Sequence, residues 1–316
     1  MSAPPRPVCS VIIRCLNEEV YIGHLLDTLL DQSVSDFECI VVDSGSTDST
    51  LAIVARYPVR ILRLASEQFS FGRALNLGLR AAHAPLAVLA SAHVYPAGPD
   101  WLERLIAPFA DPQVALVYGK QRGNTTTKYS EHHIFARQFP DDAHRQQEPP
   151  FCNNANAAIR RTVWEKLPYD ENLTGLEDID WARRAMALGH RIVYAPQAEV
   201  IHVHDESPSR IFRRYFREAL AWRHIFPNSR FPAQDFVRAT LEHILSDLRA
   251  AWRSGVLTRE MASILMFRTM QYWGTYLGMR GRTVSQAERR TLYYYPAEGW
   301  PERRSREAAG DIGRDP

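Results

Sequence analysis

The chain has 316 residues, of which 45% are hydrophobic and 23% are charged, and its formal net charge is +2. This composition excludes a disordered or fibrous protein and predicts a globular one with a sizeable core. The four cysteines show no C-x-x-C spacing, which argues against a cysteine zinc site and favours reduced thiols in a cytoplasmic protein. We expect neither a signal peptide nor a membrane span, because the N-terminal residues lack an apolar core and no run of about 18 apolar residues occurs.

The first part of the chain alternates between apolar, β-branched runs and amphipathic segments. Strands are predicted at residues 8–14, 37–42, 59–64 and 86–89, and helices between them include residues 49–57 and 73–82. Strands and helices that alternate in this rhythm predict a parallel sheet with helices on both faces. A helix at residues 101–109 and a strand at residues 114–118 continue the pattern.

The middle of the chain is less regular. Residues 119–150, rich in Thr, His, Gln and Asp, are predicted to form a long loop, and an Asn-rich strand follows at residues 151–160. A short strand after residue 190 is expected to end at Pro196, because proline interrupts a strand ladder.

From residue 208 onward the pattern becomes helical. Helices are predicted at residues 209–226, 236–252 and 260–279, and the tail at residues 302–316 is expected to be disordered. The change in pattern predicts a catalytic α/β domain at residues 1–207 and a helical module at residues 208–316.

Polar side chains follow the predicted strands, at the edge of the sheet where ligands bind. They cluster at residues 14–19, 43–48 and 91–93, and Arg73 lies in a fourth loop. Asp43, directly after a buried strand, can accept a hydrogen bond from the N3–H of a pyrimidine, and an arginine can stack on a base or pair with phosphate. A dinucleotide-binding site is not predicted, because no G-x-G-x-x-G follows the first strand.

Two adjacent carboxylates, Glu177 and Asp178, come directly before an amphipathic run and therefore lie at a helix N-terminus. The peptide dipole there favours negative charge, so either acid can stay ionised and accept a proton from an incoming nucleophile. The alternative is that both acids only complement the dipole in the first helical turn. Because His202 and His204 follow the next strand, acids at one end and imidazoles at the other frame a candidate site.

Four stretches of the chain resemble a known family in the same order: CSVIIRCLNEEVYIGHLLDTLLDQ, FECIVVDSGSTDST, FGRALNLGLRAA and LEDIDWARRAMALGHRIVYAPQAEVIHVH. The resemblance is to the family 2 inverting glycosyltransferases, especially the bacterial rhamnosyltransferase-like members that build surface polysaccharides. It covers residues 8–207 and implies the GT-A fold, an α/β nucleotide-diphospho-sugar transferase fold with a mixed, mostly parallel sheet. The helical region would then be a C-terminal extension.

The resemblance also implies roles for individual residues. Asp178, beside Glu177, would be the general base that deprotonates the acceptor hydroxyl. The nucleotide sugar, UDP- or dTDP-linked, would be bound by Arg14, Asn17, Glu19, Asp43, Ser44, Arg73, Ser91 and Ala92. A glycan or lipid-linked acceptor would be bound by Asn153, Asn154, Asn156 and Trp181.

The chain departs from the family pattern at one place. Most members carry an Asp-x-Asp whose last acid holds a divalent metal, Mn²⁺ or Mg²⁺, but this chain has Ser91-Ala92-His93. His93 with His202 or His204 could form a metal site that suits Mn²⁺ better than Mg²⁺, since Mg²⁺ prefers oxygen ligands. Two alternatives stay open: a metal-independent transferase, or a non-catalytic nucleotide-sugar-binding scaffold subunit that has lost the metal-binding acid.

The first C-terminal helix has a broad apolar face, and its arginines lie opposite or beside that face: Arg210, Arg213, Arg214 and Arg217. Such a helix either lies in a membrane interface or packs on the catalytic domain with solvated arginines. A membrane contact would bring the enzyme to an acceptor at the inner face of the cytoplasmic membrane, and the same apolar helices could equally pair two chains. No nucleic-acid partner is expected, because no recognition module accompanies the basic residues.

Overall fold

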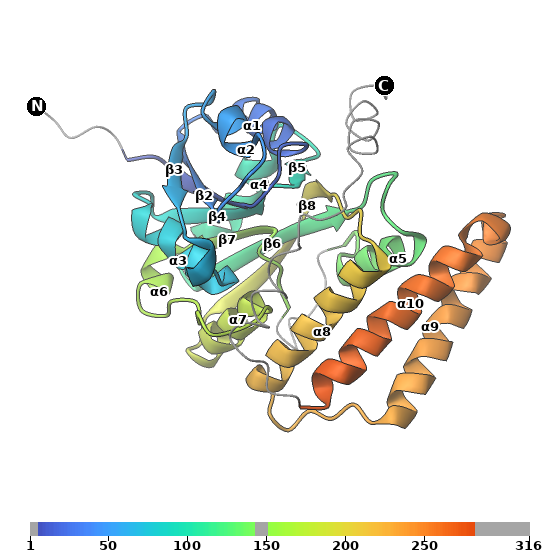
Figure 1. The fold of residues 1–316 in the computed structure, drawn as a ribbon. Helices are drawn as coiled ribbons and strands as arrows, with labels where there is room; N and C mark the ends of the chain where they lie inside the picture. The colour runs from blue at the N-terminus through green and yellow to red at the C-terminus, as the bar shows by residue number, and fades with distance from the viewer. Residues whose placement is uncertain (1–5, 143–150, 282–316) are drawn as a thin grey trace, which may run out of the picture.

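An eight-stranded sheet lies at the centre of the computed structural model, which describes residues 6–142 and 151–281 (Figure 1). The strands are β1 (Cys9–Cys15), β2 (Phe37–Asp43), β3 (Arg60–Arg63), β4 (Leu86–Ser91), β5 (Val94–Pro96), β6 (Val114–Arg122), β7 (Asn156–Arg160) and β8 (Arg191–His202). Their order is β3-β2-β1-β4-β7-β6-β8-β5. Four of the seven neighbouring pairs are parallel, and the pairs β4–β7, β6–β7 and β5–β8 are antiparallel. The predicted mixed, mostly parallel sheet is therefore confirmed.

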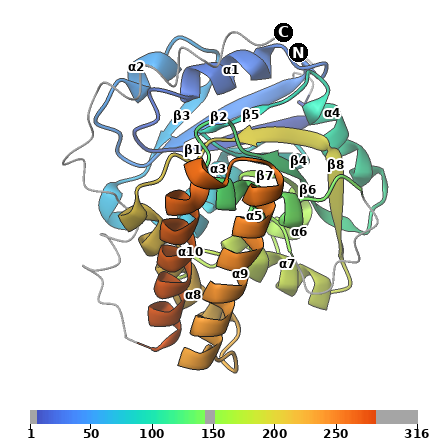
Figure 2. The ribbon, with the colours of Figure 1, turned by 90° about the vertical axis from the view of Figure 1, so that its right-hand side faces the viewer.

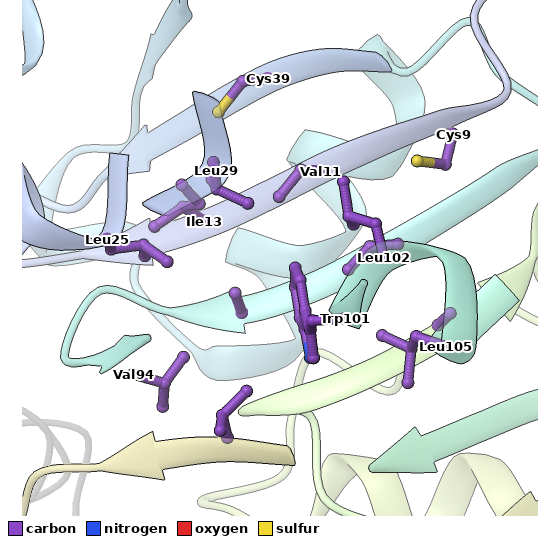
Figure 3. Close-up of a cluster of buried hydrophobic side chains, with 14 of the residues drawn as sticks. Cys9, Val11, Ile13, Leu25, Leu29, Cys39, Val94, Trp101, Leu102 and Leu105 are labelled. Carbon is purple, nitrogen blue, oxygen red and sulfur yellow. The ribbon is translucent and has the colours of Figure 1, made fainter. Parts of the chain in front are cut away.

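Helices cover both faces of this sheet. They are α1 (Ile22–Leu30), α2 (Thr50–Val54), α3 (Phe71–Ala81), α4 (Trp101–Ile106), α5 (Tyr129–Gln138), α6 (Arg161–Trp164), α7 (Glu177–Ala187), α8 (Pro208–Ile225), α9 (Ala233–Arg253) and α10 (Leu257–Met279), with short 3₁₀ turns at Ser66–Gln68 and Ala107–Ala110. Alternate residues of β1 point to opposite faces. Val11 and Ile13 pack with α1 and α4, as Figure 3 shows, whereas Ile12 packs in a second core with α3 and α7.

The first four strands begin and end within two residues of their predicted bounds. The buried apolar runs of β1, β2 and β4 leave little freedom, because each of them must be covered on both faces of the sheet, whereas β3 is a short, partly exposed edge strand. The three C-terminal helices also lie where the helical periodicity predicts them. The predicted tail at residues 302–316 lies outside the described residues.

Two predictions about the middle of the chain are wrong. The segment predicted as a long loop from residue 119 instead continues β6 to Arg122 and then forms α5, and its last residues, 143–150, lie outside the described part. Pro196 does not end β8. Instead, the pairing of β8 with β6 becomes irregular there, between the Gly119–Ala195 and Gln121–Val200 partners, so the missing N–H of the proline falls where no regular ladder bond is needed.

Helices α8, α10 and α9 lie side by side against one flank of the sheet domain (Figures 1 and 2). Gly274 and Gly278 of α10 face the backbone of α8, where a Cβ atom would overlap the carbonyl oxygens of Phe212 and Phe216. Small residues four positions apart thus let the two helices approach closely. In the described part of the chain, no helix combines the length and the apolar character needed to cross a membrane.

We expect Gly274→Ala to destabilise the protein by about 1–3 kcal/mol, because the added methyl group must push two helices apart. Gly23→Ala is a matched control in α1, where the nearest atom to an added Cβ is 3.4 Å away. There the substitution should be neutral or stabilising by up to about 1 kcal/mol, since alanine loses less backbone entropy than glycine. Urea unfolding of both variants measures the difference, and equal effects would contradict the close α8–α10 contact.

Candidate active site

The loops that follow β1 and β2 are joined through side chains. Asn17 Oδ1 accepts a hydrogen bond from the backbone N–H of Thr47 at 2.8 Å, and Glu19 Oε2 accepts one from the N–H of Ser49 at 2.9 Å. Both side chains therefore hold the loop that comes directly after Asp43. In the structure these two predicted nucleotide-binding residues therefore hold a loop at the carboxyl edge of the sheet.

Asp43 and Ser44 are buried at the end of β2. The carboxylate of Asp43 accepts hydrogen bonds from the N–H groups of Gly45 and Ser46 at 3.1 and 3.2 Å, and the N–H of Ser44 donates to the carbonyl of Cys15 at 3.0 Å. The carboxylate is thus fixed at the carboxyl edge of the sheet.

The end of β4 lies beside the end of β1. Ser91 is the register partner of Arg14, and the N–H of Ala92 donates to the carbonyl of Arg14 at 3.2 Å. Three of the polar clusters predicted from the sequence therefore meet at one edge of the sheet. His93 follows Ala92 directly. Its carbonyl accepts a hydrogen bond from the N–H of Val203, just after β8, at 3.0 Å.

The three histidines predicted as metal ligands lie together. The rings of His93 and His202 stack with their centroids 5.1 Å apart, and the Nε2 atoms of His202 and His204 are 2.9 Å apart. One ring nitrogen from each histidine lies within 4.8 Å of those of the other two. The structure therefore brings all three side chains into one cluster, which we call the histidine cluster.

An oxygen atom faces the Nδ1 atom of every ring in the histidine cluster. Glu18 Oε1 is 2.7 Å from His93 Nδ1, Gln121 Oε1 is 2.7 Å from His202 Nδ1, and Glu131 Oε1 is 2.7 Å from His204 Nδ1. An Nδ1–H that donates to oxygen leaves a lone pair on Nε2, which is the arrangement that metal-ligating histidines adopt. Two Nε2 lone pairs at 2.9 Å repel each other unless a proton or a metal cation lies between them.

The charge states of these imidazoles differ. Burial lowers the pKa of His202 well below its usual value, and the neighbouring imidazoles lower it further, so this ring is neutral at pH 7. Burial also acts to lower the pKa of His93, but the Glu18 carboxylate outweighs it and raises the pKa above the usual value. A divalent cation would satisfy the facing lone pairs of His202 and His204, so the donor set fits a metal ion.

A buried network of charges holds the third histidine. Glu131 of α5 binds His204 and also accepts from Arg214 Nη2 of α8 at 2.7 Å, and Arg214 contacts Glu206 at the same distance. Burial acts to raise the pKa of Glu131, but Arg214 and His204 outweigh it and bring the pKa to about 2. The prediction of solvated arginines on this helix is therefore wrong for Arg214, which is largely buried against the site.

Glu177 and Asp178 begin α7, as predicted, but only 5% and 9% of their surfaces are exposed. Asp178 accepts hydrogen bonds from the N–H groups of Asn154 at 3.1 Å and Ile179 at 2.8 Å, and Glu177 accepts from Arg14 Nη1 at 3.3 Å. Burial and then the adjacent Glu177 carboxylate raise the pKa of Asp178 to about 7. The helix dipole alone was expected to keep this acid ionised, and burial corrects that expectation. A carboxylate whose pKa lies near 7 is well matched to accept a proton at neutral pH.

Asn17 and Leu176 are the non-glycine residues in the described chain that adopt a left-handed backbone, each with a φ of 54°. Asn17 follows β1, and Leu176 directly precedes Glu177. Such conformations cost about 1–3 kcal/mol and persist where surrounding contacts enforce them, often at functional sites. Both residues adjoin the polar groups described above.

The remaining predicted residues are engaged within the protein. Arg73 donates to Glu171 Oε2 at 2.7 Å, and Asn153 Oδ1 accepts from the N–H of Ala155 at 2.9 Å. Asn154 lies directly against the acid pair, because its side-chain amide donates to Glu177 at 3.4 Å. Of the acceptor-side residues, Asn154 therefore has the clearest contact with the carboxylates.

Two predicted acceptor-binding residues belong to the core instead. The amide of Asn156 donates to the carbonyls of Lys120 and Ala198, and its oxygen accepts from the indole of Trp101. Trp181 is fully buried, and its indole N–H donates to the carbonyl of Leu167 at 2.6 Å. Neither side chain has a face or a polar group left for a sugar, so we correct both assignments.

The sequence did not single out the residues that orient the histidines. Glu18 lies within the polar cluster at residues 14–19, so its position after a buried strand is a sequence signal that could have identified it. Gln121 and Glu131 fall in the stretch that the sequence predicts to be a loop, and the sequence pattern favours a solvated position for Arg214. These contacts join residues 73 to 83 positions apart, which local patterns cannot pair.

Comparison with solved structures identifies the architecture as a GT-A fold. A mannosyltransferase, PcManGT from Pyrobaculum calidifontis, described as a complex with GDP-Man and Mn²⁺, matches with a TM-score of 0.58 and 22% identity over 86% of this chain and 85% of that one. Residues 1–349 of S. aureus TarS, in complex with UDP, match with a TM-score of 0.52 and 18% identity over 85% of this chain and 90% of that one.

The sequence profile of glycosyl transferase family 2 matches residues 10–167, which is half of the chain, and the chain belongs to this family. The O-antigen chain rhamnosyltransferase RfbN of Salmonella typhimurium is 25% identical over 283 residues, covering 84% of this chain and 90% of that protein. The O-antigen chain rhamnosyltransferase WbaN of Salmonella anatum is 26% identical over 255 residues, covering 75% and 80%. The resemblance seen in the sequence motifs is confirmed, and the protein is a glycosyltransferase.

Proposed function

We propose that this glycosyltransferase inverts the anomeric centre as it moves a sugar from a UDP- or dTDP-linked donor to a hydroxyl of a glycan or lipid-linked acceptor. The observation that carries the proposal is the buried Asp178, whose pKa of about 7 suits a general base, in a fold that also assembles the histidine cluster. The similarity to two O-antigen chain rhamnosyltransferases supports a role in bacterial surface polysaccharide synthesis and favours hexosyl or rhamnosyl transfer.

Asp178 accepts the proton of the acceptor hydroxyl as that oxygen attacks the anomeric carbon from the face opposite the diphosphate. The bond between the anomeric carbon and the diphosphate oxygen breaks in the same step, and the nucleoside diphosphate leaves with the electron pair. The N–H groups of Asn154 and Ile179 hold the carboxylate in place during this transfer. We assign Asn153 and Asn154 to the acceptor side of the cleft.

The nucleotide lies, in this proposal, at the carboxyl edge of β1, β2 and β4. Asp43 and Ser44 contact the base, and Arg14, Ser91 and Ala92 line the path of the ribose and diphosphate. Asn17 and Glu19 act through the loop that they hold. Arg73 is paired with Glu171, so it reaches a base or phosphate only if that contact opens.

His93, His202 and His204 would hold a divalent metal, since all three present nitrogen donors whose partner nitrogens are oriented by oxygen atoms. Nitrogen ligands favour Mn²⁺ over Mg²⁺. A bound ion would neutralise the charge that develops on the leaving diphosphate. PcManGT, a fold neighbour, is described with Mn²⁺ and GDP-Man, which supports a metal in this chain as a proposal.

We expect Asp178→Asn to lower turnover by about 10²–10⁴-fold, because the amide cannot take the hydroxyl proton. Its affinity for nucleoside diphosphate should stay unchanged. Asp180→Asn, two residues along α7 and paired with Arg183 and Arg184, is the matched control and should keep its turnover within a few-fold. Initial-rate assays of sugar transfer measure turnover, and titration with nucleoside diphosphate measures affinity. Full activity of Asp178→Asn would refute the assignment of Asp178 as the general base. No activity in the wild type with any donor would favour the alternative of a non-catalytic nucleotide-sugar-binding scaffold.

We expect Glu177→Gln to move the acidic limb of the pH profile of kcat/KM to lower pH by about one unit. Activity requires ionised Asp178, so it falls as the pH drops through the pKa of about 7. Removing the negative charge of Glu177 lowers that pKa. The Asp180→Asn control should leave the limb in place, and a limb that stays fixed or moves upward in Glu177→Gln would contradict the coupling of the two acids.

The acceptor proposal includes a contact with the inner face of the cytoplasmic membrane. In this proposal the contact lies on α9 and α10 and not on α8, because α8 packs between α10 and the site. Figure 1 shows α9 at the outer edge of the molecule. Large apolar side chains are exposed there, including Trp252 at 71%; the others are Val237, Leu241, Leu245, Met261, Leu265 and Trp273. Exposed arginines accompany them at Arg238, Arg249, Arg253 and Arg259, and this combination suits an anionic lipid surface.

We expect the purified chain to sediment with vesicles of phosphatidylglycerol and phosphatidylethanolamine. The triple variant Leu241→Ser, Leu245→Ser, Trp252→Ser should lose about tenfold or more of this binding, since three large apolar side chains no longer enter the interface. Equal binding by the variant would contradict the membrane contact. A dimer that the same substitutions dissociate, with no vesicle binding, would instead identify the surface as a homodimer interface.

A further inference from the structure

Four arginines lie near the candidate site, and they differ in whether a carboxylate forms an ion pair with them. Three have acidic partners: Arg14 pairs with Glu177, Arg73 with Glu171, and Arg214 with Glu131 and Glu206. Within residues 6–142 and 151–281, the guanidinium of Arg217 has no carboxylate partner, and its Nε atom is buried without a hydrogen bond. The carboxylate of Glu218 interacts with Arg217 only at longer range, so no described acid is bonded directly to this guanidinium.

The guanidinium of Arg217 lies on an aromatic ring that belongs to the site. Its central carbon is 4.6 Å from the centroid of Phe71, at the start of α3. The guanidinium of Arg14 lies 5.3 Å from the same centroid, and Arg14 binds Glu177. Arg217 thus contacts the same ring as the arginine that holds the acid pair. Stacking on an aromatic face fixes the plane of a guanidinium and leaves its edge N–H groups available.

Two contacts join the helix that carries Arg217 to the two halves of the site. Thr174 Oγ1 donates to the carbonyl of Arg217 at 2.9 Å, which joins α8 to the loop that leads into Glu177. One turn earlier on the same helix, Arg214 binds the Glu131 that orients His204. Helix residues three positions apart have Cβ atoms about 5–6 Å from each other. Helix α8 therefore borders both halves of the site within one turn.

We propose that Arg217 binds a diphosphate group of a substrate, an inference that rests on the proposed function. A diphosphate held at the histidine cluster is an anion, and its charge grows as the bond to the sugar breaks. An arginine that is not held in a direct ion pair with a protein carboxylate can bind phosphate oxygens through two parallel charge-assisted hydrogen bonds. The diphosphate belongs either to the nucleotide-sugar donor or to a lipid-diphosphate acceptor, which carries the same chemical group.

The test compares Arg217→Gln and Arg217→Lys with Arg249→Gln, a control in which an exposed arginine of α9 is replaced by the same residue. Each variant is titrated with UDP, dTDP and the corresponding monophosphates in the presence of Mn²⁺. If the donor is bound, Arg217→Gln should weaken diphosphate binding by about 10–100-fold, with a much smaller effect on the monophosphates. Arg217→Lys, which keeps the charge but loses the paired donors, should fall between wild type and Arg217→Gln.

If the acceptor is bound, the nucleotide affinities should stay unchanged and the KM for a polyprenyl-diphosphate-linked acceptor should rise by a similar factor. Unchanged nucleotide affinity together with unchanged acceptor KM would overturn the proposal. An equal loss of mono- and diphosphate binding with a lowered unfolding midpoint would also overturn it, because Arg217 would then only support the fold. If the wild type bound no nucleotide, the proposed function itself would fail. If the wild type bound nucleotide and Arg217→Gln bound it equally well, only the contact between Arg217 and the donor would be refuted.

Discussion

The approach of two imidazole nitrogens, the Nε2 atoms of His202 and His204 at 2.9 Å, is the constraint around which the site is built. Oxygen atoms of Gln121 and Glu131 hold the opposite nitrogens, so the two Nε2 atoms face each other and need a proton or a metal cation between them. Gln121 belongs to β6 and Glu131 to α5, and Arg214 of α8 forms an ion pair with Glu131. The strand order places β6 beside β8, so the sheet topology and the three-helix bundle both serve the same cluster.

The acid end of the site follows a different principle. Glu177 is held by the positive charge of Arg14, whereas burial and the negative charge of Glu177 both disfavour ionisation of Asp178. The two adjacent carboxylates thus have unlike surroundings, and the proposed mechanism assigns the role of general base to Asp178. Leu176, the N-cap residue of α7, adopts a left-handed backbone conformation directly before this pair.

Local patterns predicted the strands that carry the site, because long apolar runs such as β1 and β2 have few alternatives to a buried position in a sheet. They missed α5, since a helix that buries Glu131 as part of an ion pair lacks the apolar stripe by which helices are recognised. The contacts of Asn156 and Trp181 could not be inferred either, because the residue type alone does not distinguish a side chain buried in a core from one that faces a sugar. The pairing of Arg214 with Glu131 depends on the packing of α8 and α5, which no local spacing encodes. The predicted division of the chain near residue 207 stays a prediction, and the buried ion pairs that cross that point show that α8 contributes to the site.

The central claim is that a histidine-containing metal site and a nucleotide pocket act together, and a calorimetric titration tests it most directly. UDP, dTDP, GDP and CDP would be added to the wild type and to His93→Ala in EDTA, in Mg²⁺ and in Mn²⁺. The account predicts that one pyrimidine nucleotide binds tightly in Mn²⁺ and that His93→Ala abolishes the gain from the metal. Equal affinity in EDTA and Mn²⁺, unaffected by His93→Ala, would contradict the metal site and leave a transferase that neutralises its leaving group with arginines.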